Sequence, residues 1–180
     1  MIKPSTPTAS LFAALLATTL ALPAFAAERA GARILDRQGA EAGTATLVEG
    51  PHGVLIHVVA KGLPPGPKAI HIHSVGTCED GAQGFVASKG HLNPAAKPHG
   101  LMNPGGPDAG DLPNLFVHAD GSVEAEFFTT LASLSGAGER ANILDADGAA
   151  LVIHENRDDH ASQPIGGAGG RFFCGVIGAR

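Results

Sequence analysis

The hydrophobic and polar positions of this chain follow the pattern of short β-strands separated by turns and long loops. Residues 53–60 read GVLIHVVA and residues 171–177 read RFFCGVI, and both runs are rich in the β-branched and aromatic residues that favour strands. Long helical periodicity is missing. The pattern predicts an all-β domain of about eight strands. They cover residues 33–37, 44–49, 53–60, 114–118, 123–129, 142–145, 150–155 and 171–177, with a further short strand at His71 and His73.

Turn residues separate these strands. An Asp-Gly turn at residues 119–122 predicts a hairpin of the strands on either side of it, and Ala146-Asp147-Gly148 predicts another. The proline-rich run 62–67 is not expected to continue a sheet, since proline cannot donate to a strand ladder.

Two long segments lack any hydrophobic period. Residues 75–113 are dominated by Gly, Pro, Asn, Asp and Lys, and residues 156–170 are polar and then glycine-rich. A loop as long as the first is normally functional or disordered. Function is favoured here because this loop contains several side chains that bind metals or form disulfides: Cys78, His91, His99, Asp108 and Asp111.

His71-Ile72-His73 is the central chemical feature of the chain. Successive side chains of a strand alternate between its faces, so the two imidazoles point the same way and form half of a metal site. Taken alone, the pair is a weak signal, and two ordinary strand histidines are the favoured interpretation. The metal interpretation gains support from further ligand-type residues downstream, namely His91, His99, Asp111 and His154.

The N-terminus has the features of a secretory signal peptide. Lys3 supplies a short basic region, residues 11–22 are apolar but too few to span a bilayer, and Ala24-Phe25-Ala26 is a small-x-small cleavage site. We expect residues 1–26 to be removed, which leaves a single domain over 27–180 in an exported, periplasmic protein. The alternative is a buried N-terminal helix. No later apolar run is long enough for a transmembrane helix.

Charge and cysteine content restrict the function further. The formal net charge is −5 at pH 7, which argues against nucleic acid and anionic membrane surfaces as partners but not against a small anionic substrate. The chain has two cysteines, Cys78 and Cys174. Export to an oxidising compartment favours a disulfide between them. Two free thiols or two copper ligands remain as the alternatives.

Six stretches of the sequence, in this order, resemble the exported bacterial type of copper/zinc superoxide dismutase. They read AIHIHSVGTC, GHLNP, KPHG, GDLPNL, LVIHENRDD and GGRFFCGVIG. The resemblance covers essentially the whole expected mature chain. The resemblance implies an eight-stranded antiparallel Greek-key barrel or flattened sandwich with two long functional loops. It also implies an enzyme that converts superoxide to dioxygen and hydrogen peroxide with one copper and one zinc per chain.

The resemblance assigns the metal ligands residue by residue. Copper would be held by His71, His73, His91 and His154, a nitrogen set that suits Cu(II). His91 would also bridge to zinc and take part in catalysis, and the other zinc ligands would be His99, Asp111 and one more residue. At that last position the family has a histidine, whereas this chain has Asp108. A carboxylate binds zinc at a similar distance, so a site with two histidines and two aspartates is expected, with weakened zinc binding.

Three further roles follow from the resemblance. Asp158 would link a copper histidine to a zinc histidine, Arg171 would attract and orient superoxide beside copper, and Cys78 would pair with Cys174. The alternatives are that Asp158 is a solvent-exposed aspartate of the loop and that Arg171 is a surface arginine, neither with a function. His160 lies near the mouth of the proposed site without matching a family ligand. The sequence favours no role for it, and modulation of the local charge is the alternative.

The sequence leaves competing interpretations open. Asp108 raises the possibility of a copper-only dismutase with a degraded zinc site. A non-enzymatic exported copper-binding protein would need neither Arg171 nor Asp158. A β-sandwich that had lost its catalytic activity and served only a structural role would not be expected to keep all four copper-binding histidines. The oligomeric state is left as monomer or homodimer.

Overall fold

The computed structural model describes residues 28–180. The predicted signal peptide and its cleavage after Ala26 lie outside this range. No helix within the described part of the chain has the length and apolar character needed to cross a membrane.

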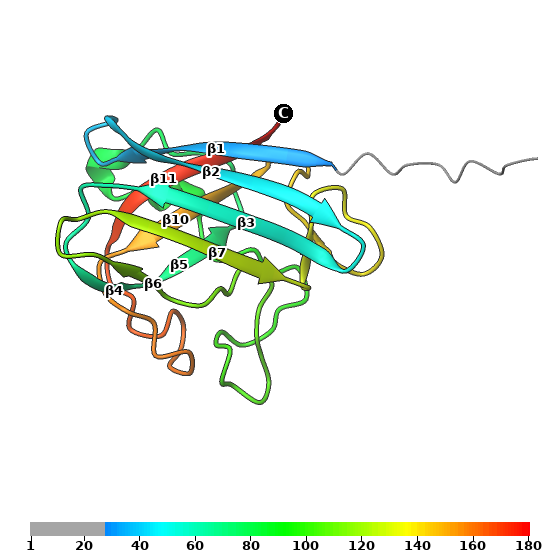
Figure 1. Cartoon of the computed structure of the whole chain (residues 1–180). Coiled ribbons are helices and arrows are strands. Elements are labelled where there is room, and N and C mark those ends of the chain that lie inside the picture. The colour runs from blue at the N-terminus through cyan, green and yellow to red at the C-terminus, as the bar shows by residue number, and fades with distance from the viewer. Residues whose placement is uncertain (1–27) are drawn as a thin grey trace, which may run out of the picture.

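A seven-stranded antiparallel sheet forms most of the domain (Figure 1). The strand order is β5-β10-β11-β1-β2-β3-β7. Two of its strands have the bounds expected from sequence, and the rest differ from the expected ones by a few residues at their ends. The bounds are β1 Arg29–Asp36, β2 Glu41–Gly50, β3 Gly53–Ala60, β5 Ile70–His73, β7 Val123–Thr129, β10 Ala149–His154 and β11 Arg171–Ala179.

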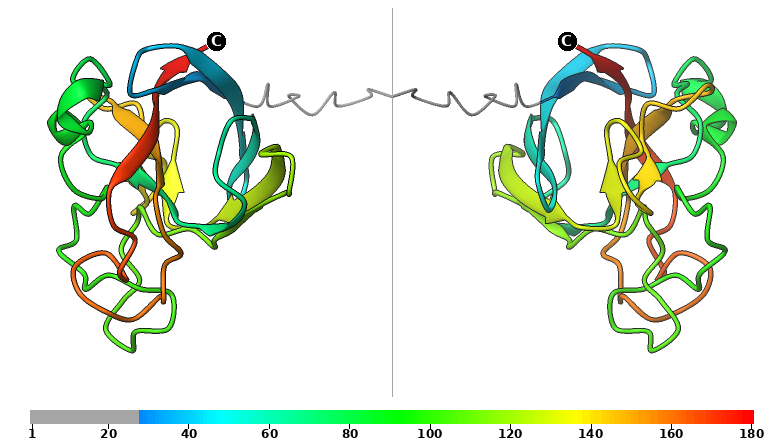
Figure 2. Two further views of the ribbon diagram at one scale, coloured as in Figure 1. Left: turned by 90° about the vertical axis from the view of Figure 1, so that its left-hand side faces the viewer. Right: turned by 90° about the vertical axis from the view of Figure 1, so that its right-hand side faces the viewer.

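The sheet curls around a single main core, as the end-on views in Figure 2 show. Alternate side chains of β3 point inward and are buried, including Ile56 and Val58, whereas Leu55 and Val59 on the opposite face are exposed. The β-branched residues predict the strand, and this period of two shows which of its faces packs on the core. In contrast, every residue of β5 and β10 is buried, because these strands have the core on one face and the long loops on the other.

Both predicted hairpins are wrong, because the two strands of each do not pair with one another. The turn at residues 118–122 forms, with a hydrogen bond from His118 N to Ser122 O, but β6 (Leu115–Val117) pairs with β4 (Gly66–Lys68). β4 lies where the proline-rich run was expected to interrupt the sheet. Likewise β9 (Ala141–Asn142) pairs in parallel with β8 (Ala132–Ser133), and β10 pairs with β5 and β11 instead. These short strands bring the described total to eleven.

The two long loops lie together at one end of the sheet (Figures 1 and 2). The first loop contains two short 3-10 helices, η1 (Gly81–Gln83) and η2 (Val86–Ser88). A backbone hydrogen bond from Met102 N to His160 O joins the loops directly, and the Gln163 side chain bonds to the backbone of His99. The loops therefore cover the outer face of β5 and β10 as one unit.

Candidate metal centre

Three buried histidines come together on two adjacent strands. His71 and His73 project from β5, where they pair with Val152 and Ala150 of β10, and His154 ends β10. All three are almost completely buried, and their ring nitrogens include a set lying within 4.8 Å of one another. The period-two prediction for His71 and His73 is therefore confirmed, and the strand register adds His154 to the same cluster.

His91 places its ring between this cluster and a second one. An isolated bridge pairs its backbone with His73, and its ring centroid lies 4.0 Å from that of His71 and 5.1 Å from that of His99. The second cluster consists of His71, His91, His99 and Asp111, again with candidate ligand atoms within 4.8 Å of one another. His71 thus belongs to both clusters, and the His91 ring of the second cluster lies beside His71 and His73 of the first, with centroid distances of 4.0 and 5.4 Å.

Asp111 is held so that one oxygen faces the histidines. Its Oδ2 accepts hydrogen bonds from the backbone N–H groups of Gly100 (2.7 Å) and Asp108 (3.0 Å). Its Oδ1 lies 2.6 Å from His99 Nδ1 and 3.4 Å from His91 Nδ1. The backbone contacts orient the carboxylate and leave Oδ1 available to a ligand.

Asp108 also reaches this second cluster. It is buried, its Oδ1 accepts from Gly110 N at 2.9 Å, and its Oδ2 lies 3.0 Å from His91 Nδ1. It falls outside the set whose members all lie within 4.8 Å, so its contact is with His91 rather than with the whole cluster. The side chain points into the site and away from solvent.

The clusters contain buried polar atoms without a hydrogen-bond partner. Among the described residues these include one ring nitrogen of each histidine and an oxygen of Asp111: His71 Nδ1, His73 Nε2, His91 Nε2, His154 Nε2, His99 Nδ1 and Asp111 Oδ1. Each such atom costs about 1–3 kcal/mol if nothing satisfies it. His99 Nδ1 and Asp111 Oδ1 lie 2.6 Å apart without hydrogen-bond geometry, so neither atom satisfies the other. The donor set therefore fits metal ions.

The opposite nitrogen of each ring is fixed by the protein. His71 Nε2 and His99 Nε2 contact the two oxygens of Asp158, at 2.8 and 3.1 Å. The carbonyl oxygens of Lys89 and Gly169 lie 2.8 Å from His73 Nδ1 and 3.3 Å from His154 Nδ1. Such partners set the tautomer and the ring orientation of a metal-binding histidine.

Burial and charge divide the histidines into two electrostatic groups. Burial lowers the pKa of His71 to about 4 and that of His154 to about 3, and it holds the pKa of His73 well below its ordinary value. Burial also opposes a charge on His91, but its contacts with the Asp108 and Asp111 carboxylates outweigh it and raise the pKa of His91 to about 9. The first group thus consists of neutral imidazoles, the form that binds a metal.

The pKa of Asp158 is lowered although the carboxylate is buried. Burial would raise its pKa, but the hydrogen bond from His71 and those from the His160 backbone and His99 hold the pKa well below its ordinary value. The carboxylate is therefore ionised while it orients both rings.

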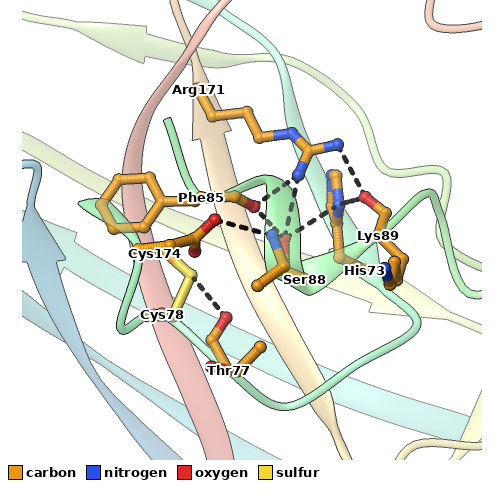
Figure 3. Close-up of a disulfide and its surroundings, with 10 residues drawn as sticks. His73, Thr77, Cys78, Phe85, Ser88, Lys89, Arg171 and Cys174 are labelled. Carbon is orange, nitrogen blue, oxygen red and sulfur yellow. Dashed lines mark hydrogen bonds between the residues drawn. A yellow bond between two sulfur atoms is a disulfide. The ribbon is translucent and has the colours of Figure 1, made fainter. Parts of the chain in front are cut away.

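Arg171 begins β11 and lies beside the histidine cluster (Figure 3). Its guanidinium donates to Phe85 O (2.5 Å), Ser88 Oγ (3.2 Å) and Lys89 O (2.6 Å), all on the first loop. The side chain is half-buried, and burial lowers the pKa of Arg171 below its ordinary value. A guanidinium nevertheless stays charged at neutral pH. A fixed positive charge thus lies beside His73.

The predicted disulfide between Cys78 and Cys174 is present (Figure 3). It joins the first loop to β11 three residues after Arg171, with the two Cα atoms 5.7 Å apart. No free cysteine remains. The alternatives of free thiols and copper ligands are therefore excluded.

Sequence reasoning missed several residues that support the site. Gln163 accepts from His99 N (3.0 Å) and donates to His99 O (2.8 Å), and Asn114 accepts from Asp158 N (2.8 Å). A Cβ on Gly166 would lie 1.6 Å from Asp158 Oδ1, so only glycine fits there. The sequence carries no signal for these contacts, since they join residues far apart in the chain.

Comparison with known proteins identifies similar chains. Residues 41–177 match the family model described as copper/zinc superoxide dismutase. A superoxide dismutase [Cu-Zn] of Caulobacter vibrioides is 51% identical over 140 residues, covering 77% of this chain and 79% of its own. Superoxide dismutase [Cu-Zn] 2 of Aquifex aeolicus is 43% identical over 150 residues, covering 83% and 86%. The crystal structure of a SOD-like protein from Bacillus subtilis superposes with a TM-score of 0.76 at 38% identity, covering 81% and 96%.

Proposed function

The chain belongs to the copper/zinc superoxide dismutase family, and on that basis we propose that it converts superoxide to dioxygen and hydrogen peroxide. The observation that carries this proposal is the convergence of unpartnered, buried imidazole nitrogens on one face of β5 and β10. A purely structural sandwich would have no reason to leave them unsatisfied.

Copper would be held by His71 Nδ1 and by the Nε2 atoms of His73, His91 and His154. These four nitrogens are buried and unpartnered, while hydrogen bonds or ion pairs hold the second nitrogen of each ring. When bound, copper supplies one-electron chemistry by alternating between Cu(II) and Cu(I). The protein supplies the ligand geometry, the electrostatics and the approach for the anion.

Zinc would be held by His91, His99, Asp111 and Asp108. Zinc bonds of about 2.0–2.1 Å place neighbouring ligand atoms of a tetrahedral site roughly 3.3 Å apart. His91 Nδ1 lies 3.0 Å from Asp108 Oδ2 and 3.4 Å from Asp111 Oδ1, close to that spacing. Asp108 would thus take the place of the family's histidine. This geometry and the family match favour a zinc-containing enzyme over the copper-only alternative.

His91 would act as the proton carrier. Its Nδ1 contacts the two aspartates, and its Nε2 is buried and without a hydrogen-bond partner, which would leave Nε2 for copper or for a proton. When it is not bound to a metal, Nε2 would take up a proton from solvent and give it to the reduced oxygen species. The second proton of hydrogen peroxide comes from solvent.

Arg171 would attract and orient the substrate. Superoxide is a small anion, and the chain carries a formal net charge of −5 that repels it. A half-buried guanidinium beside His73 provides a local positive field that counteracts this repulsion. Three hydrogen bonds to the first loop keep it in one position.

The enzyme would act after export. Residues 1–26 would be removed as a signal peptide, and the domain over 27–180 would work in the periplasm, where its disulfide is stable. All proposed ligands come from one chain, so the chemistry is available to a monomer as well as to a homodimer.

The test is a comparison of two histidine substitutions. His73→Ala removes a proposed copper ligand, whereas His57→Ala removes a half-exposed histidine of β3 that pairs with Glu124. We expect His73→Ala to lose copper and nearly all dismutase activity, and His57→Ala to retain both. Equal activity in the two variants, at equal copper content, would refute the proposed site.

A further inference from the structure

His160 is bound to both long loops through its backbone. Its N–H donates to Asp158 Oδ1 at 2.6 Å, and its carbonyl oxygen accepts from Met102 N at 2.9 Å. The residue has φ = 61°, in the left-handed region that few residues other than glycine and asparagine adopt. This conformation directs the ring back toward Asp158 and Asn114.

Asn114 determines which nitrogen of the His160 ring accepts a hydrogen bond. Asp158 N can only donate, so the Asn114 atom 2.8 Å from it must be the amide oxygen. The amide nitrogen of Asn114 then carries two hydrogens. It donates one to Asp158 O and the other to His160 Nε2, each at 2.9 Å. His160 Nε2 is therefore an acceptor and carries no proton.

A neutral imidazole with an unprotonated Nε2 carries its hydrogen on Nδ1. Nδ1 of His160 is buried, has no hydrogen-bond partner, and lies 3.6 Å from Asp158 Oδ2. The same oxygen contacts His71 Nε2 at 2.8 Å. The Nδ1–H group therefore faces the carboxylate that orients both His71 and His99.

We propose that His160 is a positioning residue that acts through Asp158, with its ring held by Asn114 as the Nδ1–H tautomer. The ring hydrogen stabilises the Asp158 carboxylate and limits its rotation, so that Oδ2 stays on His71 and Oδ1 on His99. This inference rests on the proposed function, because it matters only if those two histidines bind metal. It replaces the expectation that His160 has no role.

The first test determines the tautomer directly. Two-dimensional 1H–15N spectra of the histidine side chains distinguish a protonated from an unprotonated nitrogen in each ring. In the reduced, copper- and zinc-loaded chain we expect His160 to carry its proton on Nδ1 only. A proton on Nε2, on both nitrogens, or exchanging between them would overturn the proposal. If the chain bound no metal, and the proposed function failed, the same spectrum of the metal-free protein would still decide the tautomer.

The second test separates the side chain from the backbone. Glycine and asparagine both tolerate φ = 61°, but only asparagine places a polar group where Nδ1 lies. Partners of metal-binding histidines typically contribute about 10–100-fold to metal affinity. We expect His160→Gly to lower zinc affinity, measured by competition with a chelator, by roughly tenfold, and His160→Asn to restore most of it. Equal zinc affinity in the two variants would contradict the role of the ring.

Discussion

Arg171 and Lys89 are joined by a hydrogen bond of 2.6 Å from the guanidinium Nη2 to the backbone carbonyl oxygen. That carbonyl oxygen is also the partner of His73 Nδ1, at 2.8 Å. One acceptor thus positions both a proposed copper ligand and the charge that attracts the substrate. A displacement of the first loop at this point would disturb both.

Replacement of Arg171 tests the electrostatic role of this charge. We expect Arg171→Ala to lower kcat/KM by about tenfold or more and to flatten its dependence on ionic strength, while copper content is unchanged. Pulse radiolysis at several salt concentrations measures both effects. Arg171→Lys is the matched control, because it keeps the charge but loses the fork of donors. Arg171→Lys should retain the dependence of kcat/KM on ionic strength. If both variants lost this dependence equally, the result would contradict electrostatic attraction of the substrate by the charge at position 171.

Substitution of Asp108 tests the unusual zinc position. We expect Asp108→Ala to weaken zinc binding by about 10–100-fold, because it removes one of four proposed ligands. Asp108→His should bind zinc at least as tightly as the natural chain, since it restores the residue type of the family. Chelator competition on copper-free protein measures both. Unchanged zinc affinity in Asp108→Ala would show that this carboxylate is not a ligand.

Two neighbouring glycines provide a matched pair. Gly166 and Gly167 both have positive φ, at 61° and 74°, so alanine is strained at either position. A Cβ at 166 would also meet Asp158 Oδ1 at 1.6 Å and His99 Nε2 at 2.9 Å, whereas a Cβ at 167 meets nothing within 4 Å. We expect Gly166→Ala to reduce zinc affinity and activity far more than Gly167→Ala. Similar metal content and activity in the two would argue against a tightly packed Asp158.

Removal of the disulfide tests the anchoring of the first loop. Cys78 and Cys174 are 96 residues apart, and closing such a loop contributes about 4–5 kcal/mol in the chain-entropy model. For a domain of this size that corresponds to a fall in Tm on the order of 10 °C. Calorimetry with and without reductant measures it, with the Cys78→Ala/Cys174→Ala double variant as control. An unchanged Tm after complete reduction would contradict the anchoring role.

The sequence predicted the local features of the fold well. Gly53–Ala60 and Val123–Thr129 form strands with the expected bounds, and the common face of His71 and His73 follows from strand periodicity. Which strands pair is not a local property. Leu115–Val117 pairs with Gly66–Lys68, about 50 residues earlier, and no turn signal encodes that choice.

The site was predictable only in part. The resemblance supplied His91, His99, Asp111 and His154, but it could not tell which nitrogen of each ring is free, because that depends on distant acceptors such as Lys89 O. Gln163 reaches His99 across 64 positions. Contacts of this kind arise from the meeting of two irregular loops, for which no periodic pattern exists.

The most direct test of the account is superoxide decay catalysed by the copper-loaded chain, with and without one equivalent of zinc. The account predicts decay near the diffusional limit of roughly 10⁸–10⁹ M⁻¹s⁻¹ with both metals, and slower decay with copper alone. Equally fast decay in both conditions would show that Asp108 has made zinc dispensable. Absence of catalysis with copper confirmed at the histidine cluster would contradict the central claim and leave a copper-binding sandwich.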